Sequence, residues 1–166
     1  MTVKTLNDLF IHELSDLYNA EKQLTKAVPK VARSTEHPEL ANLFKSGIED
    51  TQIQLERIDR IIDVYDLKLK RVKCAAMEGL VEETREAIDA VDKGPVRDAA
   101  LVAQIQKINH YQIASCGTLA TFADHLGFGE AAELLRQTLE EQKLSDKRLT
   151  EFAEQEINAE AEQQSP

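Results

Sequence analysis

With 166 residues, of which 42% are hydrophobic and 30% charged, the chain is long enough for one globular domain with its own core. Its net charge of −10 argues against binding to nucleic acid or to an anionic membrane surface, because both attract basic proteins. No apolar run has the length of a membrane span, and the N-terminal residues lack a signal-peptide core. Cys74 and Cys116 are isolated from each other in sequence, which favours free thiols and a cytoplasmic location.

The first predicted helix begins after Thr5 and continues to the break at residues 35–38, with apolar side chains every three or four positions. Thr5 and Asp8 fit a capping box at its start. Pro29 is expected to kink its last turns. A second helix of the same periodicity, residues 41–65, follows the break. The short connection makes these two helices antiparallel neighbours.

A long connection, residues 66–93, separates this pair from the next one, and it contains a shorter amphipathic stretch at 72–91. The stop-start signal Gly94-Pro95 opens a third long helix, which ends at Gly127-Phe128-Gly129. The fourth helix covers residues 132–157.

Four long helices with a long crossover predict an all-α fold, a ferritin-like antiparallel four-helix bundle with a short extra helix. The bundle is expected to occupy residues 1–160, followed by a frayed polar tail at 161–166. The apolar side of residues 72–91 has to cover one flank of the bundle or meet another subunit, and this predicts a homodimer.

Each long helix carries polar residues near the midpoint of its apolar face. Because midpoints of neighbouring antiparallel helices lie at one level, we expect these side chains to converge on one layer in the core. Glu49, Asn109 and Glu141 flank that level and are expected to turn toward it. The interruptions, in chain order, are Glu21, Thr51 with Gln52, Gln112 with Ser115, and Gln142 with Asp146.

Two explanations compete for this layer. A closed hydrogen-bond network that fixes helix register is one, because buried polar groups are costly unless they are satisfied. A metal site is the other, because metal sites in helical bundles use a Glu from each of two helices and Glu-x-x-His pairs from the others. The residues alone favour the network.

Six segments of the chain resemble the YciE/YciF family of bacterial stress-associated proteins, which belongs to the ferritin-like superfamily. The resemblance implies a ferritin-like bundle, a homodimer, a link to osmotic or general stress, and no established reaction. The segments include the AEKQL and AMEGL boxes, and they are residues 10–24, 48–59, 70–83, 96–101, 108–127 and 138–150.

The family pattern also implies a candidate metal layer, to which Glu21 and Glu49 would contribute carboxylates. Relatives tend to carry a carboxylate or imidazole at four positions that are carboxamides in this chain. Carboxamides are neutral and weak ligands, so the exchange favours an uncharged network over a di-iron or di-manganese centre. The four positions are Gln52, Asn109, Gln112 and Gln142.

We therefore predict a stress-associated protein without a reaction of its own, whose polar layer derives from a di-metal site. The alternative is an iron- or manganese-binding protein of oxidative defence, with one weak cation held by Glu21, Glu49 and Glu141. His110 lies off the apolar face and is expected to bond to a neighbouring helix rather than to a metal. The sequence contains none of the motifs of hydrolases, kinases or thioredoxins.

Overall fold

The computed structural model describes residues 2–164, which contain helices and no strand. Four of the helices are long, and the prediction of an all-α fold is confirmed. Residues 161–163, expected in a frayed tail, belong to the last helix, and residues 165–166 lie outside the described part of the chain. The elements are α1 (Leu6–Ser34), α2 (Pro38–Tyr65), α3 (Ala75–Ala90), α4 (Pro95–His125), α5 (Gly129–Phe152), the π-helical turn η1 (Ala153–Ile157) and α6 (Asn158–Gln163).

The helix ends follow the local signals in the sequence. The Oγ1 of Thr5 accepts a hydrogen bond from the N–H of Asp8 at 3.0 Å, and the Asp8 carboxylate accepts from the N–H of Thr5 at 3.1 Å, so the capping box is confirmed. Pro38 and Pro95 occupy the first turns of α2 and α4, where no backbone N–H is needed. Asp66 ends α2 in a left-handed conformation, with φ of 47°.

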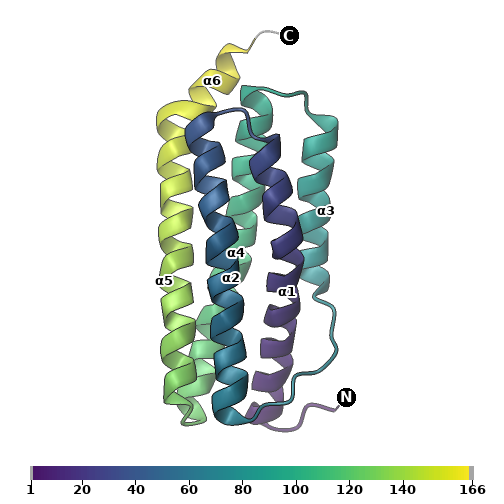
Figure 1. Cartoon of the computed structure of the whole chain (residues 1–166), viewed down its shortest axis with the longest axis vertical. Helices are drawn as coiled ribbons and strands as arrows, with labels where there is room; N and C mark the ends of the chain where they lie inside the picture. The colour runs from purple at the N-terminus through teal and green to yellow at the C-terminus, as the bar shows by residue number, and fades with distance from the viewer. Residues whose placement is uncertain (1, 165–166) are drawn as a thin grey trace.

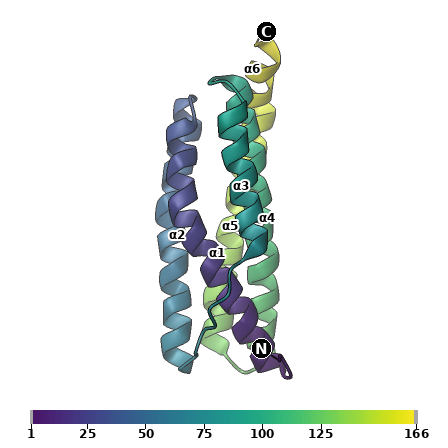
Figure 2. The same cartoon turned by 90° about the vertical axis from the view of Figure 1, so that its right-hand side faces the viewer.

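The four long helices pack side by side along one axis (Figures 1 and 2). In Figure 1, α1 and α5 run upward, and α2 and α4 run downward. α1 contacts α2 and α4, and α5 contacts the same two helices, so these neighbours in the bundle are antiparallel. Because α2 and α4 run in the same direction, the chain has to return along the bundle between them, through residues 66–74 and α3.

Helix α3 covers one flank of the bundle by packing on α1 and α4. Met77, Thr84 and Ile88 form its buried face. Cys74, at its N-terminal cap, donates its backbone N–H to Asn19 of α1 at 2.9 Å, and its sulfur contacts the hydroxyl of Tyr111 at 3.1 Å. Of the two outcomes expected for the 72–91 stretch, the structure shows the first, coverage of a flank.

The core consists of two apolar clusters separated along the bundle axis. One cluster includes Leu24, Leu40 and Leu101, and the other includes Leu14 and Leu119. Between them lies a buried polar level, with side chains from all four long helices. The convergence expected from the interruptions of the apolar faces is therefore present in the fold.

His37 fixes the turn between α1 and α2 to the end of α5. Its Nδ1 accepts the N–H of Leu40 at 3.5 Å, so Nε2 carries the ring proton and donates it to Glu156 at 3.0 Å. The ring also packs edge to face on Phe152, with centroids 5.1 Å apart. Asp98 of α4 holds the same turn by accepting the backbone N–H groups of Glu36 and His37 at 3.0 and 2.8 Å.

Replacing His37 by Ala is expected to lower the free energy of unfolding by about 1–2 kcal/mol, because the cap, the bond to Glu156 and the ring contact are lost together. His37→Asn is the matched variant, since Asn restores the cap alone and should recover part of the loss. Urea denaturation of the three proteins measures the effect. Equal stability of the wild type and His37→Ala would contradict this role.

Candidate functional site

The centre of the buried polar level is a hydrogen-bonded triad of Glu21, Gln54 and Gln112. The amide nitrogen of Gln112 donates to Oε1 of Glu21 at 2.7 Å and to the side-chain oxygen of Gln54 at 3.2 Å. All three side chains are almost completely buried, with exposed fractions of 1%, 2% and 3%. One carboxamide on α4 therefore joins α1 to α2 across the bundle interior.

Gln54 is the central residue that sequence reasoning missed. The predicted apolar face of α2 followed Thr51, Leu55 and Ile58, and Gln54 lies one position off that path. The spacing of Gln54 from Thr51 and Ile58 is three and four residues, which is equally compatible with the buried face. The sequence therefore also allowed a second buried face, formed by Thr51, Gln54, Ile58 and Ile61. This spacing could have identified Gln54, and all four side chains are buried.

Glu21 is a buried carboxyl group with incomplete hydrogen bonding. Burial raises its pKa from about 4.5 to about 7, and the bond from Gln112 opposes this shift. Its Oε2 atom and the amide nitrogen of Gln54 have no partner among residues 2–164. At pH 7 the Glu21 carboxyl group is therefore about half ionised. The layer also contains a donor and an acceptor that water is able to satisfy.

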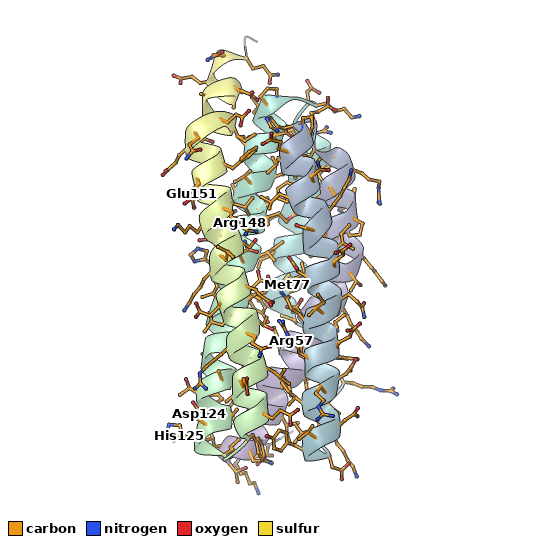
Figure 3. All side chains as sticks on the ribbon, turned by 60° about the vertical axis from the view of Figure 1, so that its left-hand side comes forward. Arg57, Met77, Asp124, His125, Arg148 and Glu151 are labelled. Carbon is orange, nitrogen blue, oxygen red and sulfur yellow. The ribbon has the colours of Figure 1, made fainter. Side chains whose placement is uncertain are left out.

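Arg57 closes the layer on the side between α2 and α5 (Figure 3). Its guanidinium group forms two bonds to the Glu141 carboxylate, at 2.6 and 2.7 Å, and a third to the hydroxyl of Thr138 at 3.1 Å. Arg57 lines the same small void as Glu21 and Gln54. A fixed positive charge thus lies beside the layer and already binds Glu141, one of the predicted metal ligands.

Two other predicted ligands lie away from the layer. Glu49 and Gln52 are exposed on α2, and the amide of Gln52 donates to Glu56 on the same helix at 3.1 Å. The expectation that they turn inward is wrong, because in a helix the buried face passes through Thr51 and Gln54 and leaves positions 49 and 52 toward solvent. The predicted cation site of Glu21, Glu49 and Glu141 does not assemble.

The amides Asn109 and Gln142 are buried, as expected, at the contact between α4 and α5. Asn109 donates to the hydroxyl of Ser145 at 3.2 Å. His110 is at the edge of this contact, 3.0 Å from Asp146, which agrees with the expected bond to a neighbouring helix.

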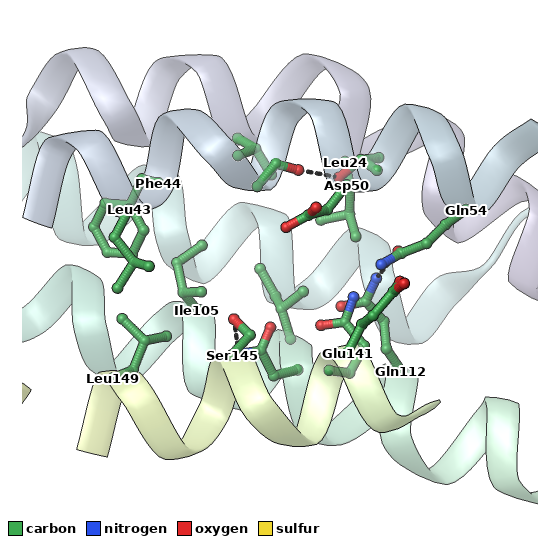
Figure 4. Close-up of a pocket in the computed structure, with 16 residues that line it drawn as sticks. Leu24, Leu43, Phe44, Asp50, Gln54, Ile105, Gln112, Glu141, Ser145 and Leu149 are labelled. Carbon is green, nitrogen blue, oxygen red and sulfur yellow. Dashed lines mark hydrogen bonds between the residues drawn. The ribbon is translucent and has the colours of Figure 1, made fainter. Parts of the chain in front are cut away.

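A cavity of about 60 Å³ adjoins these amides, with room for several water molecules. It extends from Gln54 and Gln112 toward Asp50 and Ser145 at the surface between α2 and α5 (Figure 4). Burial raises the pKa of Asp50, and the nearby carboxylates of Glu141 and Glu49 add to this effect. The cavity gives water a route to the layer, past the polar side chains at its inner and outer ends.

The donor set of the layer does not fit a di-metal centre. Such centres use several anionic carboxylates and imidazoles, whereas the buried level offers one carboxyl group, carboxamides and hydroxyls. Within residues 2–164, the only group of three His, Cys, Asp or Glu side chains with ligand atoms within 4.8 Å of one another is His37, Glu156 and Glu160, at the α1–α2 turn. There the Nε2 of His37 already pairs with the Glu156 carboxylate at 3.0 Å, and this group lies at the end of the bundle, away from the layer.

The fold and site define an all-helical protein with two apolar clusters joined by a buried amide–carboxyl layer. A family model described as a domain of unknown function, DUF892, matches residues 5–162, and the chain belongs to this family. The chain is 52% identical to Protein YciF of Escherichia coli over 163 residues, which are 98% of each sequence. The resemblance inferred from the sequence is confirmed.

Solved structures agree with this assignment. The crystal structure of the E. coli stress protein YciF superposes with a TM-score of 0.90, over 94% of this chain and 99% of that one. A putative structural protein from Rhodopseudomonas palustris, 38% identical, gives 0.84 over 89% and 94% of the two chains. A protein from Xanthomonas campestris, 22% identical, shares the fold with a TM-score of 0.74 over 95% and 96%. Within residues 2–164, none of the helices is both long and apolar enough to cross a lipid bilayer.

Proposed function

We propose that this chain is a cytoplasmic, stress-associated protein with ferritin-like wiring and no reaction at its centre, whose polar layer derives from a di-metal carboxylate site. The directions of the four long helices and the return through α3 support the proposed ferritin-like wiring. Two relatives, one described as a stress protein and the other as a putative structural protein, support a role of this kind. The two free thiols, Cys74 and Cys116, suit a reducing compartment.

The observation that carries the proposal is the bridge made by the Gln112 amide between Glu21 and Gln54. An amide nitrogen donates hydrogen bonds and offers no lone pair to a cation, so its orientation toward both oxygens favours a network over a metal. The Arg57–Glu141 pair adds a positive charge next to the layer and occupies a carboxylate that a cation would need. The function of the layer in this proposal is to fix the register of the four helices.

Thermal denaturation tests the proposal. Fe(II) under anaerobic conditions, Mn(II) and a chelator are expected to leave the melting temperature unchanged, because the folded state has no site that prefers the metal. A cation bound at a hundred times its dissociation constant would instead raise the melting temperature by about 5–10 °C. A rise of that size with either metal would contradict the proposal.

A second candidate, binding of one iron or manganese ion, has one observation in its favour. Oε2 of Glu21 is buried without a partner among residues 2–164, and the cavity that reaches the neighbouring Gln54 and Gln112 is also lined by the carboxylates of Asp50 and Glu141. A cation there would have oxygen ligands and an entry path. The same melting experiment decides between the candidates, because this one predicts stabilisation by metal.

A further inference from the structure

Three side chains with metal-ligating atoms meet at the end of the bundle where the turn between α1 and α2 lies beside the end of α5 (Figure 1). They are His37, Glu156 and Glu160, and their ligand atoms all lie within 4.8 Å of one another. The Nε2 of His37 is 3.0 Å from Oε1 of Glu156. Two ligand atoms of one tetrahedral zinc ion are roughly 3.3 Å apart, so a small outward movement of the Glu156 carboxylate would admit the ion.

The imidazole of His37 is fixed in place before any ion binds. The ring packs edge to face on Phe152, and Asp98 accepts the backbone N–H of His37 at 2.8 Å. The side chain is only 13% exposed, whereas that of Glu156 is 44% exposed. A ligand that is already immobile loses little conformational entropy on binding, and the two glutamates keep the freedom to adjust their oxygens to an ion.

The two carboxylates lie where a cation would relieve electrostatic repulsion. Glu156 of η1 and Glu160 of α6 are four residues apart on continuous helical backbone, and like charges at this spacing repel each other. They are near the C-terminus of that helix, where the helix dipole disfavours negative charge, and no basic residue lies in the last turn of either element. Among residues 2–164, no lysine or arginine pairs with either carboxylate.

We propose that His37, Glu156 and Glu160 form a zinc site that fastens the C-terminal helix to the turn between α1 and α2. One imidazole and two carboxylates are a donor set that zinc accepts, with water as the fourth ligand. Zinc binds Nε2 through its lone pair, so the ring proton moves to Nδ1 and the long 3.5 Å contact with the N–H of Leu40 is given up. The π-helical turn that carries Glu156 is a distortion frequently found at functional sites.

This site is independent of the central polar layer. It lies at the end of the bundle, and none of its three ligands belongs to the hydrogen-bonded triad. Zinc binds nitrogen and oxygen ligands more tightly than manganese or iron(II) does. Zinc is therefore the ion that tests the end of the bundle, whereas iron and manganese test the layer.

Calorimetric titration with zinc chloride tests the site on the full chain, after a chelator has been added and removed by dialysis. The wild type is expected to bind one ion per chain, and His37→Asn and Glu156→Gln should each bind about tenfold more weakly or worse, because each loses a ligand. His37→Asn keeps the helix cap, and circular dichroism shows whether each variant is folded. Glu154→Gln is the matched control, since it removes an exposed carboxylate of η1 outside the site, and it should bind as the wild type does.

Zinc K-edge absorption spectroscopy identifies the ligands. Nitrogen and oxygen at about 2.0–2.1 Å are expected, whereas binding by Cys74 or Cys116 would give sulfur at about 2.3 Å. Absence of zinc binding, sulfur ligands, or equal affinity in the wild type, His37→Asn and Glu156→Gln would each overturn the proposal and leave the proposed function intact. Zinc that is lost in Glu21→Gln and retained in His37→Asn would lie in the layer, and that result alone would contradict both.

Discussion

The stability of Glu21→Gln relative to the wild type is expected to increase by about 2 kcal/mol as the pH rises from 5 to 8. In the folded wild type, burial raises the pKa of Glu21 to about 7, whereas the unfolded chain releases this proton near 4.5. The stabilising effect of protonated Glu21 is therefore complete below about pH 4.5 and is lost as the pH rises to about 7. Glutamine keeps the oxygen that accepts from Gln112 and has no proton to lose.

The measurement is the free energy of unfolding in urea at several pH values for both proteins, analysed as the difference between them. Glu49→Gln is the matched control, because it removes a carboxylate from an exposed position of α2, and its stability should remain close to that of the wild type. A difference between Glu21→Gln and the wild type that stays constant from pH 5 to pH 8 would show that Glu21 is not a desolvated carboxyl. The wild type is expected to lose stability as the pH rises. If added metal reversed this loss and had no effect on Glu21→Gln, the metal-binding candidate would be favoured.

Gln112→Glu together with Gln142→Glu is expected to destabilise the metal-free protein by about 3–5 kcal/mol near pH 8. The new carboxylate at position 112 would face the Glu21 oxygen that the amide now reaches at 2.7 Å, and the two donated bonds would be lost. Two carboxyl groups at this distance do not both ionise, so part of the loss should be recovered at acidic pH. Urea denaturation at both pH values measures the effect.

Manganese is expected to restore much of the stability of this double variant, because the exchange gives the layer two further carboxylates beside Glu21, and carboxylates are ligands that suit manganese. Gln52→Glu with Gln137→Glu is the matched control, since both residues are exposed and the added charge is the same. It is expected to stay within about 0.5 kcal/mol of the wild type and to show no rescue. Destabilisation without rescue would mean that the layer does not derive from a metal site.

The helices and the level of the polar layer could be predicted from the sequence, because both depend on local signals and on helical periodicity. The capping box at Thr5 and the proline at position 38 marked helix starts, and Glu21, Gln112 and Gln142 interrupted otherwise apolar faces. An antiparallel packing of the long helices was then enough to bring these interruptions to one level. The level of the polar layer therefore follows from the position of each polar residue along its helix.

Which side chains form the layer was harder to predict from the sequence, because this depends on the rotation of each helix about its axis. In α2 the buried face includes Gln54, and Glu49 and Gln52 point to solvent. A rotation of one position exchanges these residues, and the apolar pattern of α2 was compatible with both. Arg57 and Glu141 are 84 residues apart in sequence, and their pairing depends on how α2 packs against α5.

The metal content of the protein tests the central claim most directly. Protein purified without chelator or metal-affinity steps, from cells grown with iron and manganese, is analysed by elemental mass spectrometry. The hydrogen-bonded layer of Glu21, Gln54 and Gln112 predicts only trace iron and manganese, well below about one-tenth of an equivalent per chain, since this layer offers a single carboxyl group. Iron or manganese near one equivalent per chain, retained by the wild type and lost in Glu21→Gln, would contradict the account.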